Sequence, residues 1–221
     1  MAGEKILTCK ELFETKQQPR INELSLDLLR EYYETHLHPY IFKFEIKDDV
    51  KNTSETFELR FDQENFCHLL GIESIVKRTV NKEDITNYRG QAGWDNVANG
   101  TLNFSVLKQK KTKSQFKSKK EKYIFFYLIP RLIDAPKAVL YDATLVEGST
   151  TIDCEILFYD NMKDANSYVH LGIKYDEKLG YHIAKTFFVE RNKVDALGDK
   201  YIVNQKEILV SKLDRTPIKV E

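Results

Sequence analysis

The amino-acid sequence predicts an α+β fold, in which N-terminal helices and a β-hairpin precede a C-terminal antiparallel sheet of about four strands. Apolar residues recur at helical spacing over residues 21–33, and they alternate with polar residues in several segments of the last third. Helices first and antiparallel strands afterwards are typical of the α+β class. We expect one domain over residues 21–215, with an N-terminal extension at 1–20 and a C-terminal tail at 216–221.

The N-terminal half predicts a helix followed by a hairpin. The helix is expected over residues 21–33 and should end before Pro39, because the residue before a proline is pushed out of the α region. Apolar and polar residues then alternate over 40–46 and again over 56–61, with a polar loop at 48–55 between them. Two alternating runs joined by a polar loop indicate a β-hairpin with a long loop.

A short helix is expected directly after the hairpin, over residues 63–70. Asp62 precedes it as a candidate N-cap, and Gly71 follows it as a helix terminator. At 100° per residue, the apolar residues of this helix cluster on one side, and His68 lies nearly opposite them.

The remaining segments complete the α+β pattern. Residues 81–99 are polar apart from Trp94 and predict a loop with a short helix. The apolar run 123–129 before Pro130 indicates a helix that is kinked or ended there, with a buried strand as the alternative. Strands are expected at 152–159, 168–174, 181–189 and 207–213, with turn-like links at 161–166 and 176–180.

Composition indicates a globular protein of the cytoplasm. The chain has 221 residues, 42% of them hydrophobic, with 34 basic and 34 acidic side chains. The longest apolar run has seven residues (123–129), whereas a membrane span needs roughly 20, so no membrane segment is expected. The three cysteines form no CxxC pair, which indicates neither a disulfide framework nor a cysteine zinc site.

Familiar enzyme motifs are absent from the sequence. It contains no GxxxxGK[ST], GxGxxG, HExxH or GxSxG, so P-loop, Rossmann, zincin and hydrolase-elbow functions have no support. His36 and His38 have the spacing of two metal ligands on a strand, but no third ligand follows nearby. Two solvated histidines at a helix end are the better interpretation. We expect no metal and no cofactor.

The histidines are the simplest acid–base candidates, because only this side chain titrates near neutral pH when unperturbed. His68 is the best of them, since it lies off the apolar stripe of its helix, although a plain surface histidine has the same pattern. His170, His182 and Thr186 all point away from the apolar positions of their strands. A sheet face with these three is either a site or the solvated side of an antiparallel sheet.

The segment 108–122 is strongly basic, with eight lysines and one glutamate. Such a run attracts phosphates, and the neighbouring Phe116 and Tyr123 could stack on bases. The alternative is a solvated, mobile helix face. The lysines that we expect to contact RNA are Lys110, Lys111, Lys113, Lys117, Lys120 and Lys122.

One segment is more specific than composition. The string TFELRFDQENFCHLLGIE, residues 56–73, combines a strand with the helix motif Phe66-x-His68-Leu69-x-Gly71. It resembles the signature of the fourth family of phage barnase–EndoU–colicin–RelE-like nucleases. The strings NGTLNFSVL (99–107), SQFKSKKEKYIFF (114–126) and YHIAKTFFVERN (181–192) are similar to later blocks of that family, in the same order.

The resemblance implies a compact barnase/EndoU/RelE-like fold and RNA cleavage without a metal. In that reaction a ribose 2′-hydroxyl attacks the adjacent phosphate and leaves a 2′,3′-cyclic phosphate. By the resemblance, His68 is general acid or base, and Thr186 hydrogen-bonds the scissile phosphate with Lys185 beside it. Lys122 stands where the pattern has an arginine, so it supplies charge without a bidentate fork. Ser114 is either part of the site or only a helix cap.

Three functions compete at this point. The first is an endoribonuclease of phage or mobile-element origin, acting as a toxin or host-takeover factor, with RNA as substrate and an antitoxin or immunity protein as a partner. The second is a catalytically inactive RNA- or protein-binding module, an inhibitor or adaptor on the same fold. The third is an interaction protein that uses an aromatic-rich surface over residues 32–44.

Overall fold

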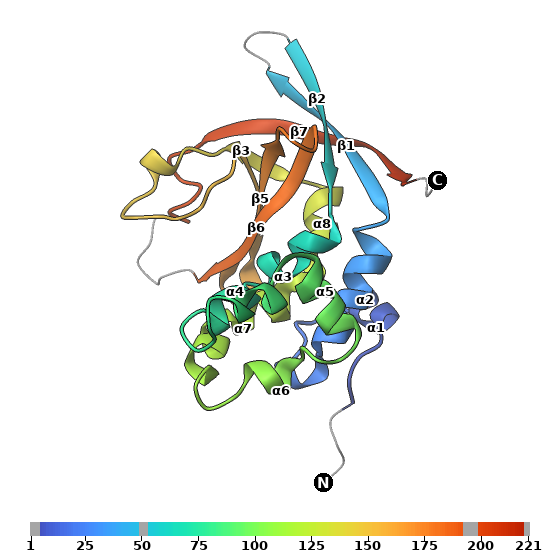
Figure 1. Cartoon of the computed structure of the whole chain (residues 1–221). Coiled ribbons are helices and arrows are strands. Elements are labelled where there is room, and N and C mark those ends of the chain that lie inside the picture. The colour runs from blue at the N-terminus through green and yellow to red at the C-terminus, as the bar shows by residue number, and fades with distance from the viewer. Residues whose placement is uncertain (1–4, 49–52, 192–198, 219–221) are drawn as a thin grey trace. The chain divides into compact units, whose positions relative to one another are not determined.

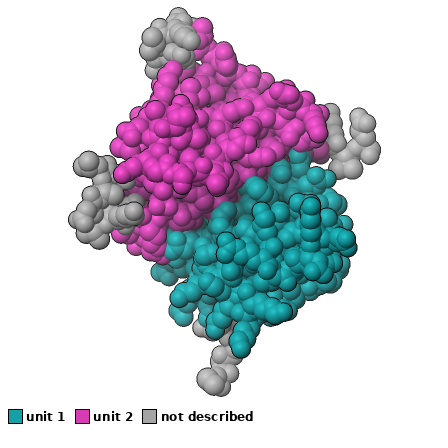
Figure 2. Space-filling view, turned by 60° about the vertical axis from the view of Figure 1, so that its left-hand side comes forward, with its two compact units in different colours: residues 1–38, 62–128 teal, residues 39–61, 129–221 magenta. Residues whose placement is uncertain are grey.

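The computed structural model describes residues 5–48, 53–191 and 199–218. The chain divides into two compact units, each built from two separate segments (Figure 2). Residues 1–38 and 62–128 form unit 1, and residues 39–61 and 129–221 form unit 2. The single domain over 21–215 stays a prediction.

Unit 1 is helical (Figure 1). Its helices are α1 (Cys9–Glu14), α2 (Leu26–His36), α3 (Phe66–Leu69), α4 (Ile72–Val76), α5 (Gly90–Ala98), α6 (Phe104–Leu107) and α7 (Lys113–Phe125). Short 3₁₀ turns are η1 (Ile21–Glu23), η2 (Gln63–Asn65), η3 (Asp84–Tyr88) and η4 (Phe126–Leu128). The loop and short helix expected over 81–99 are confirmed as η3 and α5. The apolar run that begins at Tyr123 forms the end of α7 and then η4, so the buried-strand alternative for it is wrong.

Two helix starts differ from the sequence prediction. The helix expected over 21–33 begins only at Leu26, because the Ser25 hydroxyl accepts the N–H of Leu28 and caps the helix there. The helix expected over 63–70 is divided into η2 and α3, and the Asp62 side chain makes no capping bond. Gly71 ends this segment as predicted, with a φ of 67° that favours glycine.

Aromatic side chains form the core of unit 1. Tyr32 and Tyr33 are fully buried, and their hydroxyls donate to the carbonyl oxygens of Tyr127 (2.8 Å) and Asp62 (2.7 Å). The Tyr33 ring also packs on Phe66, with ring centroids 5.4 Å apart. The aromatic-rich surface expected over residues 32–44 is therefore wrong, since four of its five tyrosine and phenylalanine rings are buried in the cores of the two units and only Tyr40 is half-buried.

In its described residues, unit 2 is a closed β-barrel with one α-helix, α8 (Ile129–Asp134) (Figure 1). Its strands are β1 (Tyr40–Asp48), β2 (Thr53–Arg60), β3 (Lys137–Leu140), β4 (Ile156–Met162), β5 (Ser167–Asp176), β6 (Tyr181–Arg191) and β7 (Lys206–Pro217). Short 3₁₀ turns are η5 (Ala143–Leu145) and η6 (Lys163–Ala165). The order around the barrel is β1-β2-β6-β5-β4-β3-β7.

The sheet is larger than predicted and not purely antiparallel. All neighbouring strands are antiparallel except β2 and β6, which pair in parallel over two residue pairs. The predicted hairpin is confirmed as β1 and β2, but it belongs to the same sheet as the C-terminal strands. The described residues therefore contain a mixed barrel of seven strands rather than a separate antiparallel sheet of about four.

Phenylalanines fill the interior of the barrel. Phe42 and Phe44 of β1, Phe158 of β4 and Phe187 of β6 have at most 1% of their surface exposed. The rings of Phe44 and Phe158 meet with centroids 5.3 Å apart, although β1 and β4 are not neighbours in the sheet. The barrel is thus closed around a packed core rather than around a channel.

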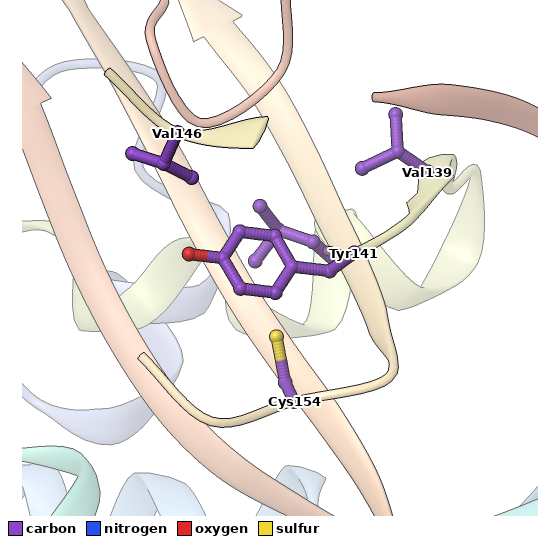
Figure 3. Packing of buried hydrophobic residues seen from close by; sticks show 5 residues of the cluster. Val139, Tyr141, Val146 and Cys154 are labelled. Atoms are coloured by element: carbon purple, nitrogen blue, oxygen red, sulfur yellow. The ribbon is translucent and has the colours of Figure 1, made fainter. Parts of the chain in front are cut away.

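A second apolar cluster covers part of the other face of the sheet. It consists of Val139, Tyr141, Val146, Cys154 and Leu157. Figure 3 shows the Cys154 sulfur pointing toward the Tyr141 ring. Both faces of this part of the sheet are therefore buried.

The structure bears on the state of the cysteines and on whether a helix could span a membrane. Cys9, Cys67 and Cys154 are buried free thiols, and burial raises the pKa of Cys67 and of Cys154 to about 12. In the described part of the chain, every helix is too short or too polar to cross a membrane.

Candidate functional site

His68 is exposed on α3 of unit 1, between the buried residues Cys67 and Leu69. Its place opposite the apolar stripe of the helix agrees with the sequence pattern. The chain turns directly after it, where the N–H of Gly71 donates to the His68 carbonyl oxygen at 2.9 Å. The core therefore holds the backbone of His68 while the imidazole lies in reach of a ligand.

Lys122 of α7 approaches the residue next to His68. Its ammonium group donates to the carbonyl oxygen of Leu69 at 3.3 Å, and the side chain is half-buried. Burial, and then the positive charge of Lys119, lower the pKa of Lys122 to about 7. Lys122 is thus part of a structured contact rather than of a freely solvated helix face.

Lys119 adds a second amine to the same place. It lies one turn before Lys122 on α7, and residues three apart share a helix face. Its aliphatic chain passes about 3.5 Å from the position that a Cβ would take at Gly71. We name His68, Lys119 and Lys122 the basic site of unit 1. Lys119 was missed from the sequence, although its helical spacing from Lys122 is a signal that could have identified it.

The other lysines of the basic run remain available to a polyanion. Lys110, Lys111, Lys113, Lys117 and Lys120 are all exposed. Phe116 and Tyr123 instead point into the core, where their rings stack on each other with centroids 5.4 Å apart. The expectation that these two rings stack on bases is therefore wrong, and the helix α7 offers charge alone.

Thr186 and Lys185 lie on β6 and belong to unit 2, whereas His68 belongs to unit 1. Lys185 occupies a β-bulge, because Gly172 pairs with Thr186 whereas Ile173 pairs with Ala184. Thr186 is half-buried, and its Cγ2 lies 2.6 Å from the position that a Cβ would take at Gly172. The methyl group of Thr186 therefore packs over glycine.

The bulge separates two residues that were expected to share a face. One extra residue on β6 shifts the alternation, so His182 lies on the opposite face from Thr186. The His182 ring packs against Phe57 and Tyr175, with centroids 4.8 and 5.2 Å away. Burial lowers the pKa of His182, and the carboxylate of Glu155, 4.0 Å away, acts in the opposite direction.

His170 is on the same face as Thr186 but is not solvated. Its side chain is fully buried, and Nε2 lies 2.9 Å from Oδ2 of the equally buried Asp199. The ring stacks on Phe188 with centroids 4.2 Å apart. The solvated or site-forming face expected for His170 is therefore a packed layer.

The remaining histidines have packing partners. His36 stacks on Phe13, with centroids 4.2 Å apart, and His38 packs against Trp94. Within the described ranges, no three side chains of His, Cys, Asp or Glu are grouped so that they could hold a metal ion.

A comparison with family models matches residues 31–214 to the phage-Barnase-EndoU-ColicinE5/D-RelE like nuclease4 family. The chain belongs to this nuclease family. The matched range contains the His68 helix, the basic helix α7 and the strand with Thr186. No curated protein and no solved structure matches the chain. The resemblance seen in the sequence is confirmed at the level of the family.

Proposed function

We propose that the protein is an endoribonuclease that cleaves RNA without a metal ion. The reaction is attack of a ribose 2′-hydroxyl on the adjacent phosphate, which leaves a 2′,3′-cyclic phosphate. The observation that carries the proposal is the exposed imidazole of His68. The next residue, Leu69, has the carbonyl oxygen that accepts a hydrogen bond from the Lys122 amine. Membership of a nuclease family supports the general chemistry.

The basic site of unit 1 supplies the kinds of group that this reaction needs. A base must remove the proton of the 2′-hydroxyl, an acid must protonate the leaving 5′-oxygen, and cations must stabilise the charge of the phosphorane. His68 is suited to proton transfer near neutral pH, and Lys119 is suited to the phosphate. The exposed lysines of α7 would hold the RNA backbone without reading its sequence.

Thr186 and Lys185 are proposed phosphate-binding residues on unit 2. The Thr186 methyl is packed against Gly172, so a role in binding falls to its hydroxyl. Thr186→Val keeps both the shape and the methyl contact while removing the hydroxyl. A loss of cleavage in this variant without loss of stability would support the role.

The first experiment is incubation of the purified protein with total RNA in EDTA, with fragment ends analysed for 2′,3′-cyclic phosphate. His68→Ala is compared with Glu64→Ala, which changes another exposed residue of the same segment. We expect cleavage by the wild type and by Glu64→Ala, and a loss of at least about 100-fold in His68→Ala. Cleavage by His68→Ala at the wild-type rate would remove His68 from the site. Cleavage that stops in EDTA would contradict the metal-independent reaction.

A second candidate is an RNA-binding module without catalysis. The exposed lysines of α7 favour it, because phosphate binding needs only charge. RNA binding that weakens steeply with salt, in a wild type that leaves RNA intact, would support this function.

A role as toxin or host-takeover factor belongs to the first proposal, as does an antitoxin or immunity partner. Growth arrest on induced expression in bacteria, absent from His68→Ala, is the expected result.

A further inference from the structure

We propose that Lys122 is the second acid–base group of the basic site and that it acts through exchange of its own proton rather than as a fixed cation. The inference rests on the proposed function, because it gives that reaction its second proton-transfer group. It concerns a residue for which the resemblance implied only positive charge.

The surroundings of the Lys122 amine are neutral or positive. Its one hydrogen bond among the described residues goes to the uncharged carbonyl oxygen of Leu69, at 3.3 Å. The two residues after Lys122 on α7, Tyr123 and Ile124, are buried and provide no carboxylate. Glu121, directly before Lys122, has a carboxylate but is not among the groups that shift the pKa of Lys122. A half-buried ammonium group without a carboxylate partner loses hydration that a single neutral acceptor does not replace.

Within the described ranges, the carboxylates on α4 and η1, two elements that contact α7, are engaged with other groups. On α4, Glu73 is paired with Arg89, with 3.7 Å between Oε1 and the guanidinium nitrogen. On η1, the Glu23 carboxylate accepts the backbone N–H of Arg20 at 2.7 Å. The other charged residues of α7 are Glu121 and four lysines (Lys113, Lys117, Lys119 and Lys120), and it is the positive Lys119 that acts on Lys122.

These surroundings favour the neutral amine at physiological pH. Burial and the charge of Lys119 lower the pKa of Lys122 to about 7, so both forms are populated near neutrality. A group in this range can both accept and donate a proton at working pH, which is the condition for efficient general acid–base catalysis.

The reaction needs two such groups in opposite protonation states. One neutral group takes the proton of the 2′-hydroxyl as the bond from O2′ to phosphorus forms. One protonated group gives its proton to O5′ as the bond from phosphorus to O5′ breaks. His68 and Lys122 together provide this pair, with one of them neutral and the other protonated at the start and the reverse at the end. Lys119 remains available to the phosphorane charge.

Substitution by arginine separates proton exchange from charge. Lys122→Arg keeps a cation and a hydrogen-bond donor, but a guanidinium does not give up its proton in a protein. We expect Lys122→Arg to lose cleavage by at least about 100-fold, and Lys77→Arg, a control at an exposed lysine of unit 1 outside the basic site, to stay within a few-fold of the wild type. Cleavage by Lys122→Arg at the wild-type rate would overturn the inference.

A measurement on the free wild-type protein checks the titration without relying on catalysis. The lysine Cε resonances are followed by NMR from pH 5 to 11, with Lys122→Arg used to assign the Lys122 signal. We expect a midpoint near 7. An ordinary lysine midpoint near 10.4 in a protein that cleaves RNA overturns this inference alone. A midpoint near 7 in a protein that never cleaves RNA overturns the proposed function, and the catalytic role of Lys122 with it.

Discussion

Nε2 of His170 lies 2.9 Å from Oδ2 of Asp199, and neither side chain is exposed to solvent. His170 is on β5, whereas Asp199 begins the turn that carries Tyr201, whose ring centroid is 5.8 Å from that of His170. The pair therefore links the turn to the sheet. A surface that would otherwise present a histidine to solvent becomes a packed layer.

Removal of one partner of this pair should be costly. Asp199→Ala leaves the imidazole of His170 buried without its carboxylate, and we expect a loss of about 2–4 kcal/mol in the free energy of unfolding by urea. Asp153→Ala is the matched control, because Asp153 pairs with Lys174 at 2.6 Å but on the surface, where such pairs contribute about 0–1 kcal/mol. Equal losses in the two variants would contradict the structural role of the buried pair.

Gly172 should tolerate no side chain while Thr186 keeps its methyl group. A Cβ at Gly172 would lie 2.6 Å from Thr186 Cγ2 and 3.0 Å from Cys154. We expect Gly172→Ala to lower the free energy of unfolding by about 1–3 kcal/mol. Thr186→Ser removes the methyl, so the double variant Gly172→Ala, Thr186→Ser should recover part of the loss. Strictly additive losses in this double-mutant cycle would contradict the contact.

Gly71 should resist substitution for a different reason. The nearest atoms to a Cβ at this position are about 3.5 Å away, so space is sufficient, but φ is 67°. We expect Gly71→Ala to cost about 1–2 kcal/mol through backbone strain, and Gly71→Asn to cost less, because asparagine adopts the left-handed region more readily. Chemical denaturation of the two variants measures the difference. An asparagine variant less stable than the alanine variant would indicate a steric rather than a backbone origin.

The local elements of the fold were predictable, and the closure of the barrel was not. Alternation over six or seven residues identifies β5 and the two strands of the hairpin, and residues 181–189 were also recognised as a strand. β3 has only four residues, Lys137–Leu140, which is too short for alternation to stand out. The parallel contact of β2 with β6 rests on two pairs, Leu59 with His182 and Arg60 with Ile183, and no local pattern encodes such a long-range pairing.

In the candidate site, too, the features set by local sequence were predictable and those set by long-range contacts were not. The exposure of His68 follows from four residues of helix, and the sequence pattern predicted it. The half-buried amine of Lys122 donates to Leu69, which is 53 positions away in the sequence. The lysine-rich segment by itself therefore could not predict this contact. The separation of His182 from Thr186 depends on a bulge at Lys185, where strict alternation fails.

Lys122 should make the stability of the protein depend on pH in a defined direction. Its pKa is lowered from 10.5 in the unfolded chain to about 7 in the folded protein, so between these values the unfolded state binds more protons. Stability therefore rises with pH across this range, and the folded state carries the full cost of the buried charge below pH 7.

Lys122→Met removes that cost, together with one hydrogen bond to Leu69 that offsets the gain by about 1 kcal/mol. We expect the variant to be more stable than the wild type by about 1–3 kcal/mol at pH 6, and the difference to disappear by about pH 10. Urea unfolding at both pH values measures it, with Lys120→Met, on the exposed side of the same helix, as the control for loss of a charge. A difference between Lys122→Met and wild type that stays constant from pH 6 to pH 10 would show that the Lys122 amine titrates as an ordinary lysine.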